Sequence, residues 1–453
     1  MKIASLERDT GSEDMAGPPV NSEVATVGGQ PVTQNYGRAL GLLASLFFMW
    51  GFITVINNTL LPHLRSVFEL NYFQTTIIES VWFIAYGVMG MPSAFLIERI
   101  GYKNALILGL AVMAVGAFGM IGAAQAISYA ITLISLFVIA SGITLLQVAA
   151  NPYVAVIGPP ESSEARLTLV QAFNSMGTFF APYFGGYLIL SRTVGGTSLE
   201  GTQITLAERI ADAQATQLPY LLVAIVLIVI AFIIWRADLP QLGESTRKAN
   251  REQRKKLSLW SHRNLVFGIP AIFIYLIAEI GVANLFINFA ILPEIGGITP
   301  AIAANYLVLL WGGMMVGRFA GSFLMRRFPA GKVLASFALF ALVVMIGAAT
   351  LHGQIAMWCL ILVGLGHSIM FPAIFALGIK GLGPLTEEAS GLLITAIAGG
   401  ALVAIQGLLA DAYGLQSSFW LTVICEVYVL WYALVGSRPT NAVVDDDATP
   451  SEV

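Results

Sequence analysis

The stretch SYAITLISLFVIASGITLLQVAANPYVAVI, residues 128–157, contains no charged side chain. A transmembrane helix needs roughly 20 mostly apolar residues, so this stretch is long enough to cross a bilayer with a tilt or a kink. The strands of a membrane barrel would alternate polar and apolar residues over about 10 positions, and this stretch does not alternate. Residues 128–157 therefore predict one membrane-spanning helix.

Eleven more apolar stretches lie on either side of it. Five fall in the same half of the chain, at 38–62, 75–97, 104–125, 167–190 and 218–236, and six follow a polar interval, at 264–292, 301–325, 332–351, 354–381, 389–411 and 416–436. Charged residues make up only 11% of the 453 positions, whereas a soluble domain carries about 25%. We therefore predict an all-α membrane protein with twelve transmembrane helices in two pseudo-symmetric six-helix bundles.

Polar segments divide the chain and indicate its orientation. Lys and Arg collect in loops that stay on the cytoplasmic side, and here they concentrate in the polar interval and in the loops after the second and eighth helices. These loops share one side if both termini are cytoplasmic. The predicted segments are a disordered cytoplasmic tail at 1–36, an N-terminal six-helix bundle at 37–236, a basic cytoplasmic linker at 237–263, a C-terminal six-helix bundle at 264–437 and a second cytoplasmic tail at 438–453.

A spaced pair of residues recurs in the two halves of the chain. A polar residue lies five positions before a proline in the first, fourth, seventh and tenth predicted helices. These pairs are Asn57 and Pro62, Gln147 and Pro152, Asn288 and Pro293, and His367 and Pro372. Repeated six-helix halves that hold a substrate between them near the membrane midplane are a transporter architecture.

Amide side chains inside the predicted helices are the main candidates for a binding site. Gln147 and Asn151 are four residues apart and share a helix face, and Gln171 and Asn174 are three apart and also share one. Amides both donate and accept hydrogen bonds, as the hydroxyl groups of a neutral sugar do. The alternative is that these amides join neighbouring helices. Further candidate contacts are Asn58, Asn288, His367, Trp82 and Trp311, the two aromatic residues being equally compatible with the membrane interface.

Few ionisable residues fall inside the predicted helices. Glu279 and Glu79 are the candidates for taking up and releasing a proton, with Glu279 preferred. His367 either titrates or serves as a neutral hydrogen-bonding residue. Charged residues at the predicted cytoplasmic ends are expected to form a conformational latch between helices. These are Glu98, Arg99, Lys103, Arg318 and Arg326.

Five stretches carry a family resemblance. They are WGFITVINNTLLPHL (50–64), LLQVAANPYVAVIGP (145–159), LVQAFNSMGTFFAP (169–182), IAEIGVANLFINF (277–289) and HSIMFPAIFALGIKGLG (367–383). Through them the chain resembles the major facilitator superfamily, and within it the fucose–galactose–glucose:proton symporter group, especially bacterial glucose/galactose transporters. The resemblance implies a two-bundle fold in the bacterial inner membrane and hexose uptake coupled to protons.

Three positions depart from the fucose transporters of that group. Asn58 and Gln147 stand where those proteins have Asp and Glu, which carry the proton or gate the sugar there, and amides cannot titrate. Either the coupling group has moved, to Glu279 or Glu79, or the chain is an uncoupled facilitator. Phe371 stands where a fucose carrier has Tyr, which argues against fucose.

Other functions remain as alternatives. The substrate could be fucose, mannose or N-acetylglucosamine in place of glucose or galactose, and an exporter of amphipathic drugs could share the fold. An enzyme is not expected, because the sequence contains no metal-ligand spacing, nucleophile elbow or phosphate-binding loop. We expect no metal or cofactor, a proton gradient as energy source with sodium not excluded, a monomer in contact with membrane lipid, and no nucleic-acid partner.

Overall fold

The computed structural model describes residues 26–27, 30–31, 36–68, 72–190, 216–237, 239 and 257–439. It gives only the backbone of residues 26–27, 30–31, 56–68, 72–77, 79, 182–190 and 301. Most of the predicted tails at 1–36 and 438–453 and most of the predicted linker at 237–263 lie outside the described residues. The segment boundaries predicted there stay predictions.

The described residues of the N-terminal half form six long helices. They are α1 (Tyr36–Phe68), α2 (Tyr72–Ile100), α3 (Tyr102–Ala126), α4 (Tyr129–Val156), α5 (Ser163–Leu190) and α7 (Gln217–Arg236), with the short helix η1 (Pro160–Ser162) before α5. The Ser128 side chain accepts the Ile131 N–H and so caps α4. Two short strands, β1 (Thr26–Val27) and β2 (Gln30–Pro31), pair antiparallel ahead of α1.

The C-terminal half repeats the pattern with more interrupted helices. Its elements are η2 (Leu259–Ser261), α9 (Arg263–Ala290), α10 (Pro300–Leu324), α11 (Ala330–Thr350), α12 (Gly353–His367), α13 (Met370–Ile379), η3 (Gly383–Leu385), α14 (Thr386–Thr395), η4 (Ala396–Leu402), α15 (Val403–Tyr413), α16 (Leu415–Ser418), α17 (Trp420–Trp431) and η5 (Tyr432–Gly436). The predicted helix 354–381 is thus two helices, and the predicted helix 389–411 is three consecutive segments.

The described helices have the length and the surface of membrane spans. Eleven helical stretches among the described residues are long and apolar enough to cross a bilayer. Helix α5, 28 residues long, lies over the remaining predicted stretch. Large apolar side chains such as Val115, Ile134, Phe232 and Val343 are exposed on the helices, where a soluble protein would bury them. The prediction of an all-α membrane protein with two six-helix bundles is confirmed.

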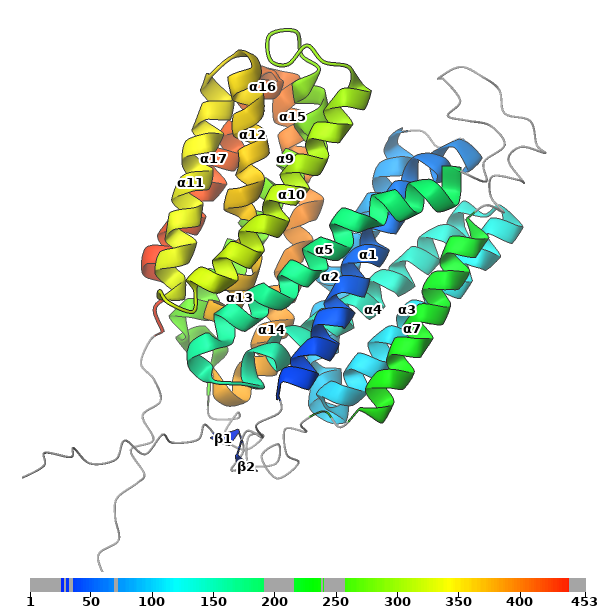
Figure 1. The fold of residues 1–453 in the computed structure, drawn as a ribbon, viewed down its shortest axis with the longest axis vertical. Helices are drawn as coiled ribbons and strands as arrows, with labels where there is room; N and C mark the ends of the chain where they lie inside the picture. The colour runs from blue at the N-terminus through cyan, green and yellow to red at the C-terminus, as the bar shows by residue number, and fades with distance from the viewer. Residues whose placement is uncertain are drawn as a thin grey trace, which may run out of the picture.

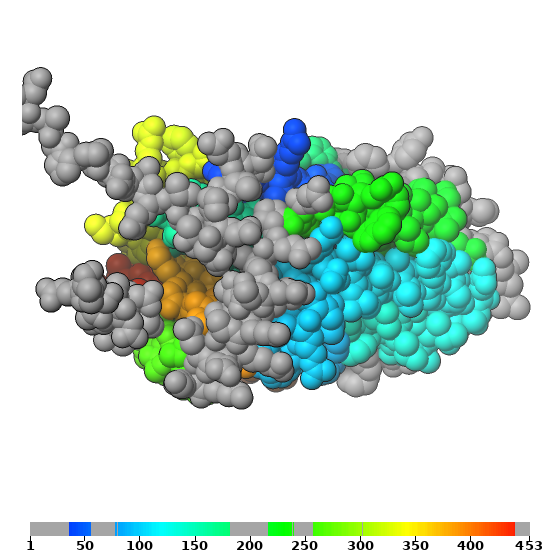
Figure 2. All heavy atoms as spheres, turned by 90° about the horizontal axis from the view of Figure 1, so that it is seen from below, coloured from blue at the N-terminus to red at the C-terminus, as the bar shows by residue number. Residues whose placement is uncertain are grey.

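The two halves meet closely at one end of the molecule. Helix α5 packs on α10, and α2 packs on α14. Gly90 permits the second contact, because a Cβ there would overlap the Thr395 side chain. In Figure 1 the halves converge at the lower end, where α13 and α14 lie, and lean apart toward the upper end. Figure 2 looks onto the lower end, with the N-terminal half in blue to green beside the C-terminal half in yellow to red.

Two prolines free main-chain carbonyls for contacts with other helices. A proline lacks the N–H that would bond the carbonyl four residues earlier. Pro152 in α4 leaves the Val148 carbonyl, which accepts the Ser390 hydroxyl of the opposite half at 3.1 Å. Pro372 in α13 leaves the Ser368 carbonyl, which accepts Arg318 Nε at 2.9 Å. The interruption between α12 and α13 at Ser368 follows from the same proline.

Candidate functional site

The amides of α4 lie buried near the contact between the halves. Gln147 is 2% exposed, and its Nε2 donates to the Tyr86 hydroxyl at 2.6 Å. Asn151 is fully buried, and its Oδ1 accepts from Gln171 Nε2 at 3.4 Å. Among the described residues, Gln147 Oε1 and Asn151 Nδ2 have no hydrogen-bond partner. One acceptor and one donor on the same helix face are therefore unused.

An unused buried polar atom has a free-energy cost of about 1–3 kcal/mol, so each one in a folded protein requires an explanation. A ligand that both donates and accepts would satisfy the two amide atoms together. A hydroxyl group does both, whereas a cation or an anion does only one. This arrangement suits a neutral polyol.

The amides of α5 differ from each other. Gln171 faces Asn151 and belongs to the same buried cluster. Asn174 instead donates from Nδ2 to the Phe47 carbonyl of α1 at 3.0 Å. Its amide therefore joins two helices in this conformation, as the alternative interpretation of the sequence allowed.

The other predicted contact residues are spread over both halves. Trp82 and Trp311 are partly buried on α2 and α10, and Asn288 is exposed near the end of α9. The side chains of Asn58 and Glu79 lie outside the described residues, and Glu279 is partly buried on α9. The structure therefore brings together Gln147, Asn151 and Gln171, and it places Asn288 on a different helix face from Glu279.

His367 forms a buried pair that the sequence analysis missed. Its Nε2 lies 2.6 Å from Oε1 of Glu426, and both side chains are almost completely buried. Glu426 Oε2 has no hydrogen-bond partner among the described residues. The signal was present in the sequence, because Glu426 is the one charged residue of the predicted helix 416–436 and an ionisable residue inside a membrane span indicates a functional site.

The helix interruption beside His367 connects the two halves. Tyr275 of α9 donates its hydroxyl to the His367 carbonyl at 3.1 Å. Arg318, which holds the freed Ser368 carbonyl, also donates from Nη1 to the Gln171 carbonyl at 3.1 Å and to the Ser175 hydroxyl at 2.6 Å. Arg318 thus links the centre of the C-terminal half to α5 of the N-terminal half through hydrogen bonds.

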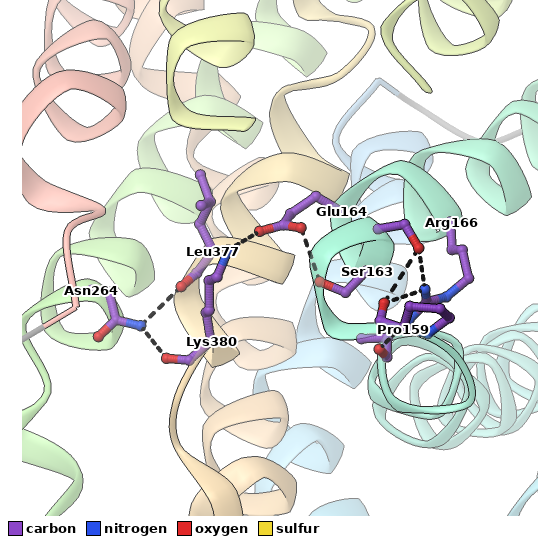
Figure 3. A network of polar contacts seen from close by, with 9 residues as sticks. Pro159, Ser163, Glu164, Arg166, Asn264, Leu377 and Lys380 are labelled. Atoms are coloured by element: carbon purple, nitrogen blue, oxygen red, sulfur yellow. Dashed lines mark hydrogen bonds and ion pairs between the residues drawn. The ribbon is translucent and has the colours of Figure 1, made fainter. Parts of the chain in front are cut away.

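An ion pair joins the halves at their lower end (Figure 3). Lys380 Nζ, after α13, lies 2.7 Å from Glu164 Oε1, in the first turn of α5. Glu164 also accepts from the Ser163 hydroxyl at 3.0 Å. On the other side of Lys380, Asn264 Nδ2 donates to main-chain carbonyls at the end of α13, including that of Lys380 at 2.9 Å. A second contact between the halves pairs the Tyr102 hydroxyl with Glu387 Oε1 at 3.1 Å.

The predicted latch residues do not form this ion pair, although Arg318, one of them, links the halves through its hydrogen bonds to α5. Lys103 donates to the Ala237 carbonyl at 2.8 Å, within the N-terminal half. Glu98 is partly buried, and Arg99 and Arg326 are exposed. Lys380 and Glu164 were not predicted, because they are separated by 216 positions in the chain and no local pattern connects them. The described residues contain no cluster of three potential metal ligands.

Comparisons with known proteins agree with this arrangement. The family model described as Major Facilitator Superfamily matches residues 42–405. The glucose/galactose transporter of Brucella abortus (strain 9-941) is 44% identical over 406 residues, covering 89% of this chain and 95% of the relative. The L-fucose-proton symporter of Escherichia coli (strain K12) is 32% identical over 416 residues, covering 90% and 94%. A crystal structure of the transporter FucP in the outward conformation is 31% identical, covers 89% of this chain and 99% of that chain, and gives a TM-score of 0.80.

Proposed function

The chain belongs to the Major Facilitator Superfamily, and we propose that it imports a hexose, glucose or galactose, together with protons by alternating access. Relatives named as glucose/galactose transporters and as L-fucose-proton symporters support the substrate class and the coupling. We place the protein in the bacterial inner membrane with both termini in the cytoplasm. We propose that it works as a monomer in contact with membrane lipid.

The observation that carries the proposal is the pair of unused amide atoms on α4. Gln147 Oε1 accepts from a sugar hydroxyl, and Asn151 Nδ2 donates to one. Gln171 lies next to them, and Trp82 and Trp311 supply aromatic faces for the apolar side of a sugar ring. Asn58, Asn288 and His367 complete the proposed set of sugar contacts, with Asn174 positioning α5 against α1.

The shape of the molecule fits the first step of import. If the lower end in Figure 1 is cytoplasmic, the ion pair between Lys380 and Glu164 closes the inner side. Similarity to the structure of FucP in the outward conformation also supports a conformation that is closed on the inner side. Sugar then enters from the outer side, the halves close over it, and the inner contacts break to release it.

The energy source in this proposal is a proton gradient, without a metal, a cofactor or a nucleic-acid partner. The test is uptake of radiolabelled glucose and galactose into proteoliposomes that contain the full chain. We expect accumulation above the external concentration when the outside is made acidic, and its loss when a protonophore is added. Equal uptake with and without the pH gradient indicates the uncoupled facilitator, and a sodium requirement indicates sodium coupling.

The contact residues are tested in the same vesicles. Asn151→Ala removes one hydrogen bond to the sugar and one to Gln171. We therefore expect the sugar concentration that gives half-maximal uptake to rise about tenfold, equivalent to about 1.4 kcal/mol. Asn104→Ala is the matched control, because the exposed Asn104 amide bonds only the Ile100 carbonyl of its own helix turn. Unchanged half-saturation in Asn151→Ala would refute the proposed site. Uptake of a lipophilic cation without saturable sugar uptake would favour the exporter.

A further inference from the structure

The proposed function requires a group that binds a proton and releases it, and we propose that this group is the buried pair of His367 and Glu426. The inference rests on the proposed function and names its proton site. It replaces Glu279 and Glu79, to which the sequence pointed. The pair lies in the C-terminal half, on α12 and α17, and His367 is also one of the proposed sugar contacts.

Burial and hydrogen bonding distinguish Glu426 from every other described carboxylate. Glu426 is fully buried, and its two oxygens are used unequally: Oε1 faces His367 Nε2 at 2.6 Å, and Oε2 has no partner among the described residues. Glu426 lies eleven residues after Leu415 and ten before Gly436, so it is about 15 Å from either end of that span. A carboxylate with an unused oxygen at this depth is stabilised by adding a proton.

The pair has two states that differ by one proton. Without that proton, a neutral imidazole faces a carboxylate, and the net charge is −1. With it, the pair is either an imidazolium facing a carboxylate or a neutral imidazole facing a carboxylic acid, and the net charge is zero. Only O–H and N–H bonds form and break, and the proton comes from the outer solution and leaves to the cytoplasm.

Polar side chains extend from Glu426 toward the upper end of the molecule. Thr422 is one turn earlier on α17 and shares its face. Gln406 of α15 donates from Nε2 to the Thr422 hydroxyl at 3.3 Å, and both residues are fully buried. Gln406 Oε1, like Glu426 Oε2, has no partner among the described residues. This row leads from the proposed proton site toward the end where α15 and α16 lie in Figure 1, which the proposed function places outside.

Other ionisable groups surround the pair. The hydroxyl of Tyr275 lies within electrostatic reach of Glu279 on its own helix, of Arg318 on α10 and of Glu426 on α17, and its ring packs edge-on against His367 with centroids 5.7 Å apart. Cys425 adjoins Glu426 in sequence and is buried with it. Arg318 is the positive charge among them and opposes protonation of the pair. Glu279 is only partly buried and lies one turn from Tyr275.

The pair is connected to the movement of the halves through Arg318. A proton drives transport only if its affinity differs between the two conformations. Arg318 bonds the Ser368 carbonyl, next to His367, and at the same time bonds Gln171 and Ser175 of the other half. When the halves separate on this side, the bonds to α5 break, and the positive charge of Arg318 is no longer held at its present distance from the pair. The proton affinity of the pair therefore changes with the conformation.

The experiment compares two measurements on the full chain in proteoliposomes: accumulation driven by a pH gradient, and exchange of labelled for unlabelled sugar without a gradient. For Glu426→Gln we expect at least a tenfold loss of accumulation with a loss of exchange below threefold. Glu279→Gln is expected to lower accumulation less than threefold. Glu294→Gln is the control, because it neutralises an exposed carboxylate in the loop after α9.

Accumulation that survives in Glu426→Gln overturns the inference. If accumulation is at the same time lost in Glu279→Gln, the proton site is Glu279. If Glu426→Gln does not fold, infrared difference spectra of the unsubstituted chain and of Glu279→Gln between acidic and neutral pH replace it. The carboxylic acid band expected for Glu426 persists in Glu279→Gln, and its absence from that variant assigns the proton to Glu279. Failure of the proposed function itself is recognised separately, because the unsubstituted chain then exchanges no sugar.

Discussion

Removing the amino group of Lys380 is the sharpest test of how the two halves are held together. The ion pair with Glu164 exists only while the start of α5 and the end of α13 touch, so Lys380→Met should shift the chain toward the conformation in which they separate. Lys380 is 48% exposed and Glu164 only 4%. An exposed pair contributes about 0–1 kcal/mol, whereas breaking a buried one costs about 3–5 kcal/mol.

A half-exposed pair at 2.7 Å falls between these limits. We expect a shift of about 1–2 kcal/mol, which changes the population ratio of the two conformations by about 5- to 30-fold. Glu164 would keep the hydrogen bond from the Ser163 hydroxyl and the electrostatic attraction of Arg166. Since a buried carboxylate that has lost its ion-pair partner is unfavourable, Glu164→Gln in the same chain should restore part of the lost stability.

The assay is a distance distribution between spin labels at Asn104, in the first turn of α3, and Phe328, in the loop after α10, both exposed, after Cys359 and Cys425 are replaced by Ala. Lys380→Met, Glu164→Gln and the double variant form a cycle that isolates the pair. Lys103→Met is the matched control, because its amino group bonds the Ala237 carbonyl within one half. A coupling energy below about 0.3 kcal/mol, or an equal shift in Lys103→Met, would refute the reasoning.

Three further substitutions follow from the contacts. Arg318→Ala removes hydrogen bonds to both halves, so we expect sugar exchange to fall more than tenfold and the thermal midpoint, followed by fluorescence, to drop; an unchanged exchange rate would contradict this. Asn264→Ala leaves three main-chain carbonyls at the end of α13 without their amide donor and should lower stability by about 1–3 kcal/mol, measured as the urea midpoint in detergent. Gly177→Ala places a Cβ against the Phe48 carbonyl and should reduce the folded yield on size-exclusion chromatography, whereas Gly122→Ala, with open space around it, should not.

The sequence predicted the architecture because the bilayer constrains it. Spans such as 104–125 and 218–236 are recognisable from length and apolar content alone, and α3 and α7 lie over them. The span predicted at 354–381 is confirmed as the apolar stretch Gly353–Ile379, and its helix is interrupted at Ser368, whose carbonyl Pro372 frees. Proline was visible in the sequence, but whether it bends a helix or ends it depends on which donor reaches the freed carbonyl.

The site was harder to predict, because spacing along one helix does not tell which neighbour a side chain meets. The helical spacing of Gln147 and Asn151 placed them on one face, and the structure shows them together. For Asn174 the same argument could not choose between a sugar and the Phe47 carbonyl, which lies 127 positions away. His367 and Glu426 are 59 positions apart, so their pairing depends on how α12 packs against α17 and no local pattern reveals it.

The carbonyls freed by Pro152 and Pro372 have a consequence for how such a protein can vary among its descendants. Their partners, Ser390 and Arg318, bond to oxygen atoms of the main chain. Any residue at position 148 or 368 presents the same oxygen, so those side chains are free to drift as long as they still fit the space. Selection on these two hydrogen bonds should therefore act on the prolines and on the donor residues. A lineage that loses one of the prolines should then tolerate loss of the matching donor.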